Sequence, residues 1–207
     1  MHEKVELLVA WADYQSAAYA CRNWHYSRSV PAGKLVKIGA WEDGNFVGVV
    51  IFSRGANSAL GNPYGLGQTE CCELTRIALR KHKSFVSEIL SKAIRLLRES
   101  SPGLRLIVSY ADKDQNHHGG IYQATNWIYT GIAECGRYFI VHGKKTHPKS
   151  IHSKYGTGAQ KIEWLRENVD PNADTISTGG KHRYLMPLDK RMRKKIQTLA
   201  QPYPKSG

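Results

Sequence analysis

The chain has 207 residues and carries 30 Lys and Arg residues against 17 Asp and Glu residues, a formal net charge of +13. This length suits one well-filled core with an appended segment, and two full domains would be tight. No run approaches the ~18 apolar residues that span a bilayer, and the first residues lack a basic-then-apolar leader. We therefore expect a cytoplasmic protein with no membrane partner. Four cysteines without a CxxC pair, Cys135 among them, predict reduced thiols.

The positive charge is concentrated toward the C-terminus. Residues 137–207 hold fifteen basic and five acidic side chains, so they carry most of the excess. Such asymmetry indicates a C-terminal part that meets a polyanion, although a merely soluble basic surface is the alternative.

The first half of the chain predicts a helix followed by a strand hairpin. Residues 12–20 favour a short helix with Asp13 as a possible N-cap. Residues 36–41 and 46–54 read as strands joined by the turn at 42–45. The loop at 55–67 is long and rich in Gly, Asn and Pro, which is typical of functional or disordered segments, and Tyr64 is its candidate substrate contact.

A strand–helix–strand unit follows. Residues 68–80 predict a strand whose alternation places Arg76 with Cys72, Leu74 and Ala78 on one face. The planar fork of Arg76 suits phosphate or carboxylate, and a structural salt bridge is the alternative. Residues 84–100 have helical periodicity with Ser84 as a possible cap, and 104–111 predict the next strand, hence two parallel neighbours.

The segment 109–131 is the candidate site. Ser109 and Asp112 would lie at the C-terminal end of a buried strand, where open α/β sheets bind their ligands. Two histidines and two glycines follow, and the glycines permit close backbone approach; the four are His117, His118, Gly119 and Gly120. Tyr122 and Trp127 offer aromatic surface for a flat ring, or else simply fill the core.

Beyond residue 131 the pattern weakens. Strands are expected at 137–143 and 182–186, helices at 161–169 and 189–200, and disorder from 202 to 207. Three histidines recur every five residues, at 142, 147 and 152, which is not the usual zinc-ligand spacing; phosphate contact by the whole basic stretch fits better. We expect a core at 1–145 and a basic extension at 146–207 packed on it.

The order of these elements resembles the GNAT acyltransferase fold. The resemblance implies an α/β (α+β) class with a GNAT-like mixed central sheet and flanking helices. GNAT enzymes carry a glycine-containing pyrophosphate loop before the main helix, and here that stretch is RKHKSF at 80–85, without small residues. Acyl-CoA is a possible donor, but the loop that would bind its pyrophosphate is atypical. Alternatively, Arg80, Lys83 and Ser84 hold another anionic cosubstrate.

Several motifs in one order are more specific. They are NWHYS (23–27), GKLV (33–36), FVGVVIFSRGAN (46–57), NPYGL (62–66), ELTRIAL (73–79) and LIVSYAD…HHGGIYQATNWIYTG (106–131). Together they resemble the Mom family of bacteriophage DNA-modification proteins, which add a carbamoylmethyl group to N6 of adenine and so shield DNA from restriction. The resemblance implies double-stranded DNA as partner, contacted by the basic extension, and action in the host cytoplasm; a homodimer is possible.

The same resemblance implies site residues. His25, Tyr26, Arg76, Asp112 and Tyr122 fall where the functional residues of the family lie. Iron is a possible cofactor, with His25 and Asp112 as candidate ligands.

The resulting hypothesis is that adenine flips out of the duplex and stacks on aromatics such as Tyr26, Tyr122 or Trp127. Asp112 would accept the N6 proton and Arg76 would stabilise charge, with Ser109 at the same strand end. Two alternatives stay open. One is a GNAT-type N-acetyltransferase acting on a protein or small amine, and the other is a DNA-binding protein without catalysis.

Overall fold

The computed structural model describes residues 5–55, 59–115, 117–133, 136–177 and 179–204. The chain forms two compact units. The first, here the core unit, comprises Met1–Ala111, His118–Gly131 and Arg183–Gly207, and the second, the inserted unit, comprises Asp112–His117 and Ile132–His182. Among the described residues, no helix combines the length and apolarity needed to cross a bilayer.

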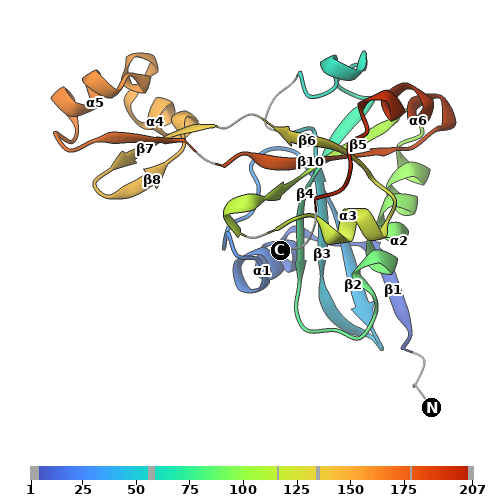
Figure 1. The fold of residues 1–207 in the computed structure, drawn as a ribbon. Coiled ribbons are helices and arrows are strands. Elements are labelled where there is room, and N and C mark those ends of the chain that lie inside the picture. Colours follow the sequence, from blue (N-terminus) through green and yellow to red (C-terminus); the bar gives the residue numbers. More distant parts are fainter. Residues whose placement is uncertain (1–4, 56–58, 116, 134–135, 178, 205–207) are drawn as a thin grey trace. The chain divides into compact units, whose positions relative to one another are not determined.

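A seven-stranded sheet with the order β1-β2-β3-β4-β5-β10-β6 organises the fold (Figure 1). Strands β1 to β4 pair antiparallel in sequence, and β4 pairs parallel with β5. The strands are β1 (Leu7–Trp11), β2 (Leu35–Glu42), β3 (Asn45–Ser53), β4 (Cys71–Leu79), β5 (Leu106–Asp112), β6 (Ile128–Ala133) and β10 (Lys181–Pro187). The mixed sheet and the parallel β4–α2–β5 crossover confirm the predicted fold class.

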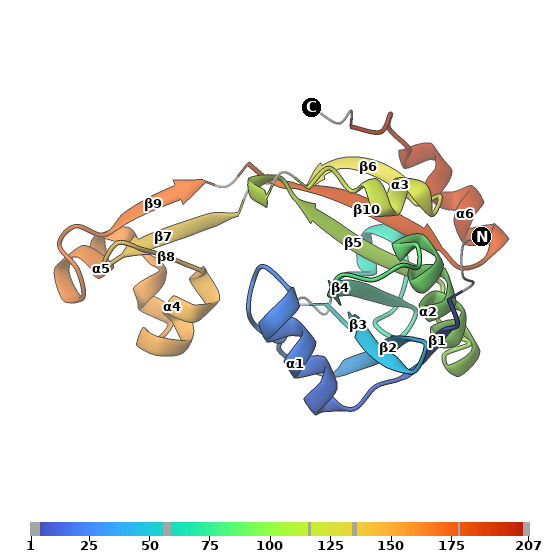
Figure 2. The same ribbon diagram turned by 90° about the horizontal axis from the view of Figure 1, so that it is seen from below.

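Helices cover both faces of this sheet. They are α1 (Tyr14–Trp24), α2 (Val86–Ser100), α3 (Gly120–Ala124) and α6 (Lys190–Ile196), with short 3-10 turns at Asn62–Tyr64, Lys113–Gln115 and Gln197–Leu199. Val50 and Phe52 of β3 pack with α2, whereas the alternating Val49 and Ile51 pack with α1. Because successive strand residues face opposite sides, α1 and α2 lie on opposite faces, as Figure 2 shows.

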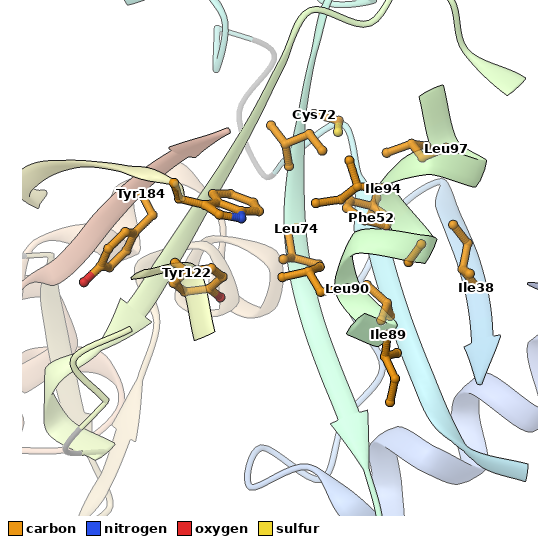
Figure 3. Packing of buried hydrophobic residues seen from close by; sticks show 14 of the residues in the cluster. Ile38, Phe52, Cys72, Leu74, Ile89, Leu90, Ile94, Leu97, Tyr122 and Tyr184 are labelled. Carbon is orange, nitrogen blue, oxygen red and sulfur yellow. The ribbon is translucent and has the colours of Figure 1, made fainter. Parts of the chain in front are cut away.

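The larger core cluster lies on the α2 face. Ile89 and Leu90 of α2 pack there with Leu74 of β4, and the cluster continues past Leu74 to Tyr122 and Tyr184 (Figure 3). On the other face, Met192 and Ile196 of α6 pack with Leu106 and Val108 of β5. The two clusters therefore pack on opposite faces of β5.

Two predicted helix caps have different outcomes. The Asp13 carboxylate accepts from the Ser16 amide at 2.7 Å, which confirms it as the cap of α1. The predicted Ser84 cap is wrong, because α2 begins at Val86 with Phe85 in the cap position and no side-chain cap. The Ser84 amide instead donates to Glu42.

The predicted alternation of β4 is wrong beyond Leu74. Ile51 pairs with Arg76 but the next residue, Phe52, pairs with Leu74, so Thr75 is the extra residue of a β-bulge. A single extra residue reverses the alternation. Arg76 therefore does not share the face of Leu74, and it lies close enough to Cys21 of α1 to affect that thiol electrostatically.

The C-terminal part differs from the expected extension at 146–207. Strand β10 lies between β5 and β6 in the central sheet, so residues 183–207 belong to the core unit. Residues just after α6 are also bonded rather than disordered: the Tyr203 hydroxyl donates to the Trp127 carbonyl at 2.6 Å, and Gln123 donates to the Pro204 carbonyl. The predicted disorder at 205–207, like the expected reduced thiol of Cys135, lies outside the described residues.

The inserted unit has its own sheet and core. Its three-stranded sheet has the order β8-β7-β9, with antiparallel pairing throughout. The elements are β7 (Arg137–Val141), β8 (Lys144–Thr146), β9 (Asp174–Ser177), α4 (Pro148–Tyr155), α5 (Ile162–Asn168) and a 3-10 turn at Thr157–Gln160. Phe139, Ile151 and Leu165 anchor its apolar cluster.

Gly119 provides a test of the core packing. Its φ is +82°, and a Cβ built there would collide with the Tyr184 ring. Gly119→Ala should therefore lower the free energy of unfolding by about 2–5 kcal/mol, the sum of left-handed strain and overpacking. Gly33→Ala is the matched control, because Gly33 has φ +97° but no atom within 4 Å of the added Cβ; it should cost about 1–2 kcal/mol. Equal losses in urea unfolding would contradict the packing role of Gly119.

Candidate active site

The site begins where two parallel strands part. Pairing between β4 and β5 runs from Cys71 with Leu106 to Leu74 with Ser109. Beyond that point β4 continues alongside β3 as far as Gly48 with Leu79. The strands therefore separate toward the C-terminal end of β5, where the sequence predicted a site.

Ser109 bridges the point of separation. It is fully buried, and its hydroxyl lies 2.9 Å from the Leu74 carbonyl and 2.8 Å from the Tyr122 hydroxyl. A carbonyl can only accept, so the single Ser109 proton goes to Leu74 and Tyr122 donates to the Ser109 oxygen. Burial raises the pKa of Tyr122 to about 12, although its bond with Ser109 opposes this. Tyr122 is therefore a neutral hydrogen-bond donor at physiological pH.

Arg76 binds the next carbonyl along β4. Its guanidinium donates from Nη1 to the Thr75 carbonyl at 2.8 Å, while its buried Nε has no hydrogen-bond partner among the described residues. Burial raises the pKa of the neighbouring Cys21 thiol, and the Arg76 charge opposes this shift. A buried guanidinium N–H without an acceptor is suited to donate a hydrogen bond to an oxygen of a bound molecule.

His25 and Tyr26 follow directly after α1. The Ser27 amide donates to His25 Nδ1 at 3.1 Å, so this nitrogen carries a lone pair. The His25 and Tyr26 rings lie 4.2 Å apart between centroids, and Tyr26 is 49% exposed. The Tyr26 hydroxyl also lies close enough to Tyr122 to oppose its ionisation. Tyr26 is thus an aromatic residue near Tyr122 that presents surface to solvent.

Asp112 belongs to the inserted unit. It is the last residue of β5, and its carboxylate lies 3.8 Å from the Lys181 ammonium. His117, in the same unit, is exposed, and its amide donates to the Asp112 carbonyl at 3.1 Å. Within the core unit, Ser109 and Tyr122 are hydrogen-bonded, Tyr26 lies near Tyr122, and Arg76 lies beside Cys21 of α1. The catalytic roles of these residues and of Asp112 stay predictions.

The sequence profile of the Mom protein family matches residues 6–205. The chain belongs to the Mom protein family. A curated relative, the methylcarbamoylase mom of Escherichia phage Mu, is 26% identical over 209 residues that cover 98% of this chain and 83% of that protein. A solved structure of a protein from Acinetobacter baylyi ADP1 assigned as an acetyltransferase has a TM-score of 0.51, with 11% identity and complete coverage of both chains. This likeness supports the GNAT-like fold.

In this Mom family chain, several predicted substrate contacts serve the core instead. Trp127 is fully buried and Tyr64 is 5% exposed, so neither presents a ring to a ligand. Gly119 makes room for the Tyr184 ring, and the His118 carbonyl accepts from the Tyr184 hydroxyl. Gly120 is exposed at the start of α3, beside the His118 ring. The sequence did not identify Tyr184 as a neighbour of Gly119, because no sequence pattern indicated that β10 pairs with β5.

The loop at 80–84 does not offer a free backbone cradle for a pyrophosphate. The Glu42 carboxylate, 8% exposed, accepts from the amides of Lys83 at 2.9 Å and Ser84 at 2.6 Å. Burial alone would raise the pKa of Glu42, but the hydrogen bonds from Ser84 and Lys83 outweigh it and hold that pKa below its ordinary value. The side chains of Arg80, Lys83 and Lys81 are exposed around a cavity of about 390 Å³ that Glu42 also lines. An anionic donor would therefore meet these basic side chains, because Glu42 occupies the amides of Lys83 and Ser84.

The proposed iron ligands do not form a recognisable centre. Among the described residues, no group of three His, Cys, Asp or Glu side chains is arranged to hold a metal ion. His25 Nδ1 already accepts from Ser27, and Asp112 lies in the other unit. These residues do not by themselves fit an iron site.

The Ser109 bridge predicts a stability difference between two small substitutions. Ser109→Ala leaves the buried Leu74 carbonyl and the Tyr122 hydroxyl without their shared partner, so it should lower the free energy of unfolding by about 1–3 kcal/mol. Tyr122→Phe keeps the bond from Ser109 to Leu74 and should cost about 0.5–1.5 kcal/mol. Urea unfolding of both variants measures this order, and the reverse order would contradict the assigned proton directions.

Glu42 predicts a pH dependence. Its folded-state pKa is lowered, so its contribution is present above the unfolded pKa of about 4.3 and is lost as pH falls through the lower folded value. Glu42→Gln should cost about 1–3 kcal/mol at neutral pH, and this deficit should shrink below about pH 4. Glu99→Gln, at an exposed position on α2, should show no such deficit. A Glu42→Gln deficit that stays constant with pH would rule out the carboxylate contact.

Proposed function

We propose that this chain transfers a carbamoylmethyl-type group to N6 of adenine in double-stranded DNA, in the host cytoplasm, and so protects that DNA from restriction. The observation that carries the proposal is membership of the Mom family across residues 6–205, together with a relative named a methylcarbamoylase. The net charge of +13 is consistent with a DNA substrate.

The target nitrogen requires extrusion of the base. N6 of adenine is paired inside the duplex, so the nucleotide must flip into the site before reaction. Tyr26 is the stacking surface we assign to the base, because it is 49% exposed while Tyr122 and Trp127 are buried. Tyr122, bonded to Ser109, would then shape the wall of the base pocket rather than stack on the base.

The transfer step needs a proton acceptor and charge stabilisation. A bond forms between N6 and the donor carbon, the bond from that carbon to its leaving group breaks, and the leaving group departs with the electron pair. The N6 proton passes to the Asp112 carboxylate, which Lys181 accompanies at 3.8 Å. The unpaired Nε of Arg76 would donate to the leaving group as it gains negative charge.

The GNAT-type acetyltransferase alternative has less support. It requires acyl-CoA, whose pyrophosphate would meet amides that Glu42 already occupies. The similarity to the Acinetobacter baylyi ADP1 structure is one of fold.

Nucleoside mass spectrometry of DNA from expressing cells tests the function and the role of Asp112. The wild-type chain should add the mass of one carbamoylmethyl group to adenine, and Asp112→Asn should reduce that product by about 100-fold or more, as expected for loss of a general base. Asp174→Asn is the matched control, because Asp174 also pairs with a cation, Arg166 at 3.6 Å, in the same unit. Unmodified adenine with the wild-type chain would refute the proposal, and full product with Asp112→Asn would remove Asp112 from the mechanism.

A further inference from the structure

Most basic residues of the C-terminal part form two sets, one in each unit of the fold. One set is on α6 of the core unit, and the other is on β7, β8 and α4 of the inserted unit. The sequence presents these as one basic region, but the structure assigns them to separate cores. Each set can therefore be considered, and mutated, by itself.

The set in the inserted unit is free of acidic residues. Residues 136–162 contain six Lys and Arg residues, three His residues and no Asp or Glu. Four of the lysines are exposed on β8 and α4: Lys144, Lys145, Lys149 and Lys154. We name these four the β8–α4 surface.

The core of the inserted unit fixes this surface in place. Ile151 of α4 is 1% exposed and packs with Phe139 of β7 and Leu165 of α5. Lys149 and Lys154 lie on the exposed side of the same short helix. A rigid element presents its charges at fixed spacing, which lowers the entropy lost on binding.

The cations of α4 lie at both of its ends. Its first turn holds Lys149 and no acid, whereas Lys154 lies in the last turn, where a cation interacts favourably with the helix dipole. Beside it, the Lys145 ammonium lies 4.9 Å from the centre of the Tyr138 ring, and the His147 ring packs edge-on to Tyr138 at 5.2 Å. Cations interleaved with aromatics indicate a surface suited to an anionic ligand.

The acidic residues between 163 and 174 lie outside β8 and α4. Asp170 is 7% exposed and accepts from the amides of His142 and Asn172. Asp174 pairs with Arg166 at 3.6 Å, and the remaining acids of that region, Glu163 and Glu167, are on α5. Their charges therefore do not interrupt the β8–α4 surface.

The α6 set differs in its environment. Lys195 donates to the Tyr64 carbonyl at 2.6 Å, so it has a structural role. Asp189 caps α6 through the Met192 amide and pairs with Arg105 at 2.9 Å, and Glu70 also lies near Arg105. Charges of both signs thus accompany the α6 cations.

We propose that the β8–α4 surface of the inserted unit binds the phosphate backbone of duplex DNA. The identity of the polyanion rests on the proposed function, whereas the existence of the binding surface rests on the charge distribution just described. Contacts of lysines with phosphates fix register on the duplex without reading its sequence. The inserted unit would hold the DNA, and the core unit would receive the flipped base.

Fluorescence anisotropy with a labelled duplex over a series of salt concentrations tests the proposal. Each phosphate contact contributes about 0.9 to the slope of log K against log salt. The triple variant Lys144→Gln, Lys145→Gln, Lys149→Gln should reduce the slope by about 2–3 and weaken binding at least about tenfold at low salt. The control Lys190→Gln, Arg193→Gln, Lys194→Gln removes equal charge from α6 and should leave the slope nearly unchanged. Circular dichroism on both variants confirms that they fold.

Three outcomes would overturn the proposal: equal losses in the two variants, a loss confined to the α6 variant, or tighter binding of the wild-type chain to duplex RNA or anionic vesicles than to duplex DNA. Nucleoside mass spectrometry of DNA from expressing cells distinguishes failure of the binding surface from failure of the proposed function. Modified adenine together with unimpaired DNA binding by the β8–α4 variant rejects only the surface. A reduced salt slope without modified adenine rejects only the chemistry.

Discussion

Two backbone carbonyls at the point where β4 and β5 part determine much of this site. Once pairing ends at Leu74 with Ser109, the carbonyls of Leu74 and Thr75 need other donors, because a buried carbonyl without a partner costs about 1–3 kcal/mol. Ser109 supplies one donor and Arg76 the other. The positions of the Ser109 and Arg76 side chains are therefore explained first by their hydrogen bonds to these two carbonyls. The same constraint directs the Arg76 guanidinium and leaves its Nε for a further acceptor.

The aromatic residues around this point divide into those that build the site and one that faces solvent. Tyr122 is held by Ser109 and packs against Tyr184 and Trp127, with ring centroids 4.9 and 5.0 Å away. Trp127 is in turn fixed by Tyr203 through its carbonyl. Rings locked in this way keep the site rigid but cannot accommodate another ring between them. Tyr26, which the core does not enclose, is the ring that we propose stacks on a base.

Much of the fold follows from local sequence patterns, and the exceptions have identifiable causes. The hairpin at 42–45, the Asp13 cap and the β4–α2–β5 crossover are local and were predictable. The bulge at Thr75 was not, because alternation in sequence cannot show that one residue is unpaired, and so Arg76 was assigned to the wrong face. The position of β10 beside β5, and hence the role of Tyr184 in packing Gly119, depends on pairing between segments about 75 residues apart. Trp127 and Tyr64 showed that aromatic content alone does not distinguish a stacking surface from a core.

The position of Glu42 determines which groups of the loop at 80–84 can bind an anion. A helix-proximal loop whose amides are free can hold a phosphate by fixed geometry, but here an internal carboxylate occupies the amides of Lys83 and Ser84. A donor at this loop would meet lysine and arginine side chains, which act as mobile charges that salt screens. Precise alignment of the donor must then come from the site at the strand ends, where the partly buried Arg76 is held by the Thr75 carbonyl. Charge at the surface would gather the anionic reactants, and the Arg76 guanidinium would orient the reacting atoms.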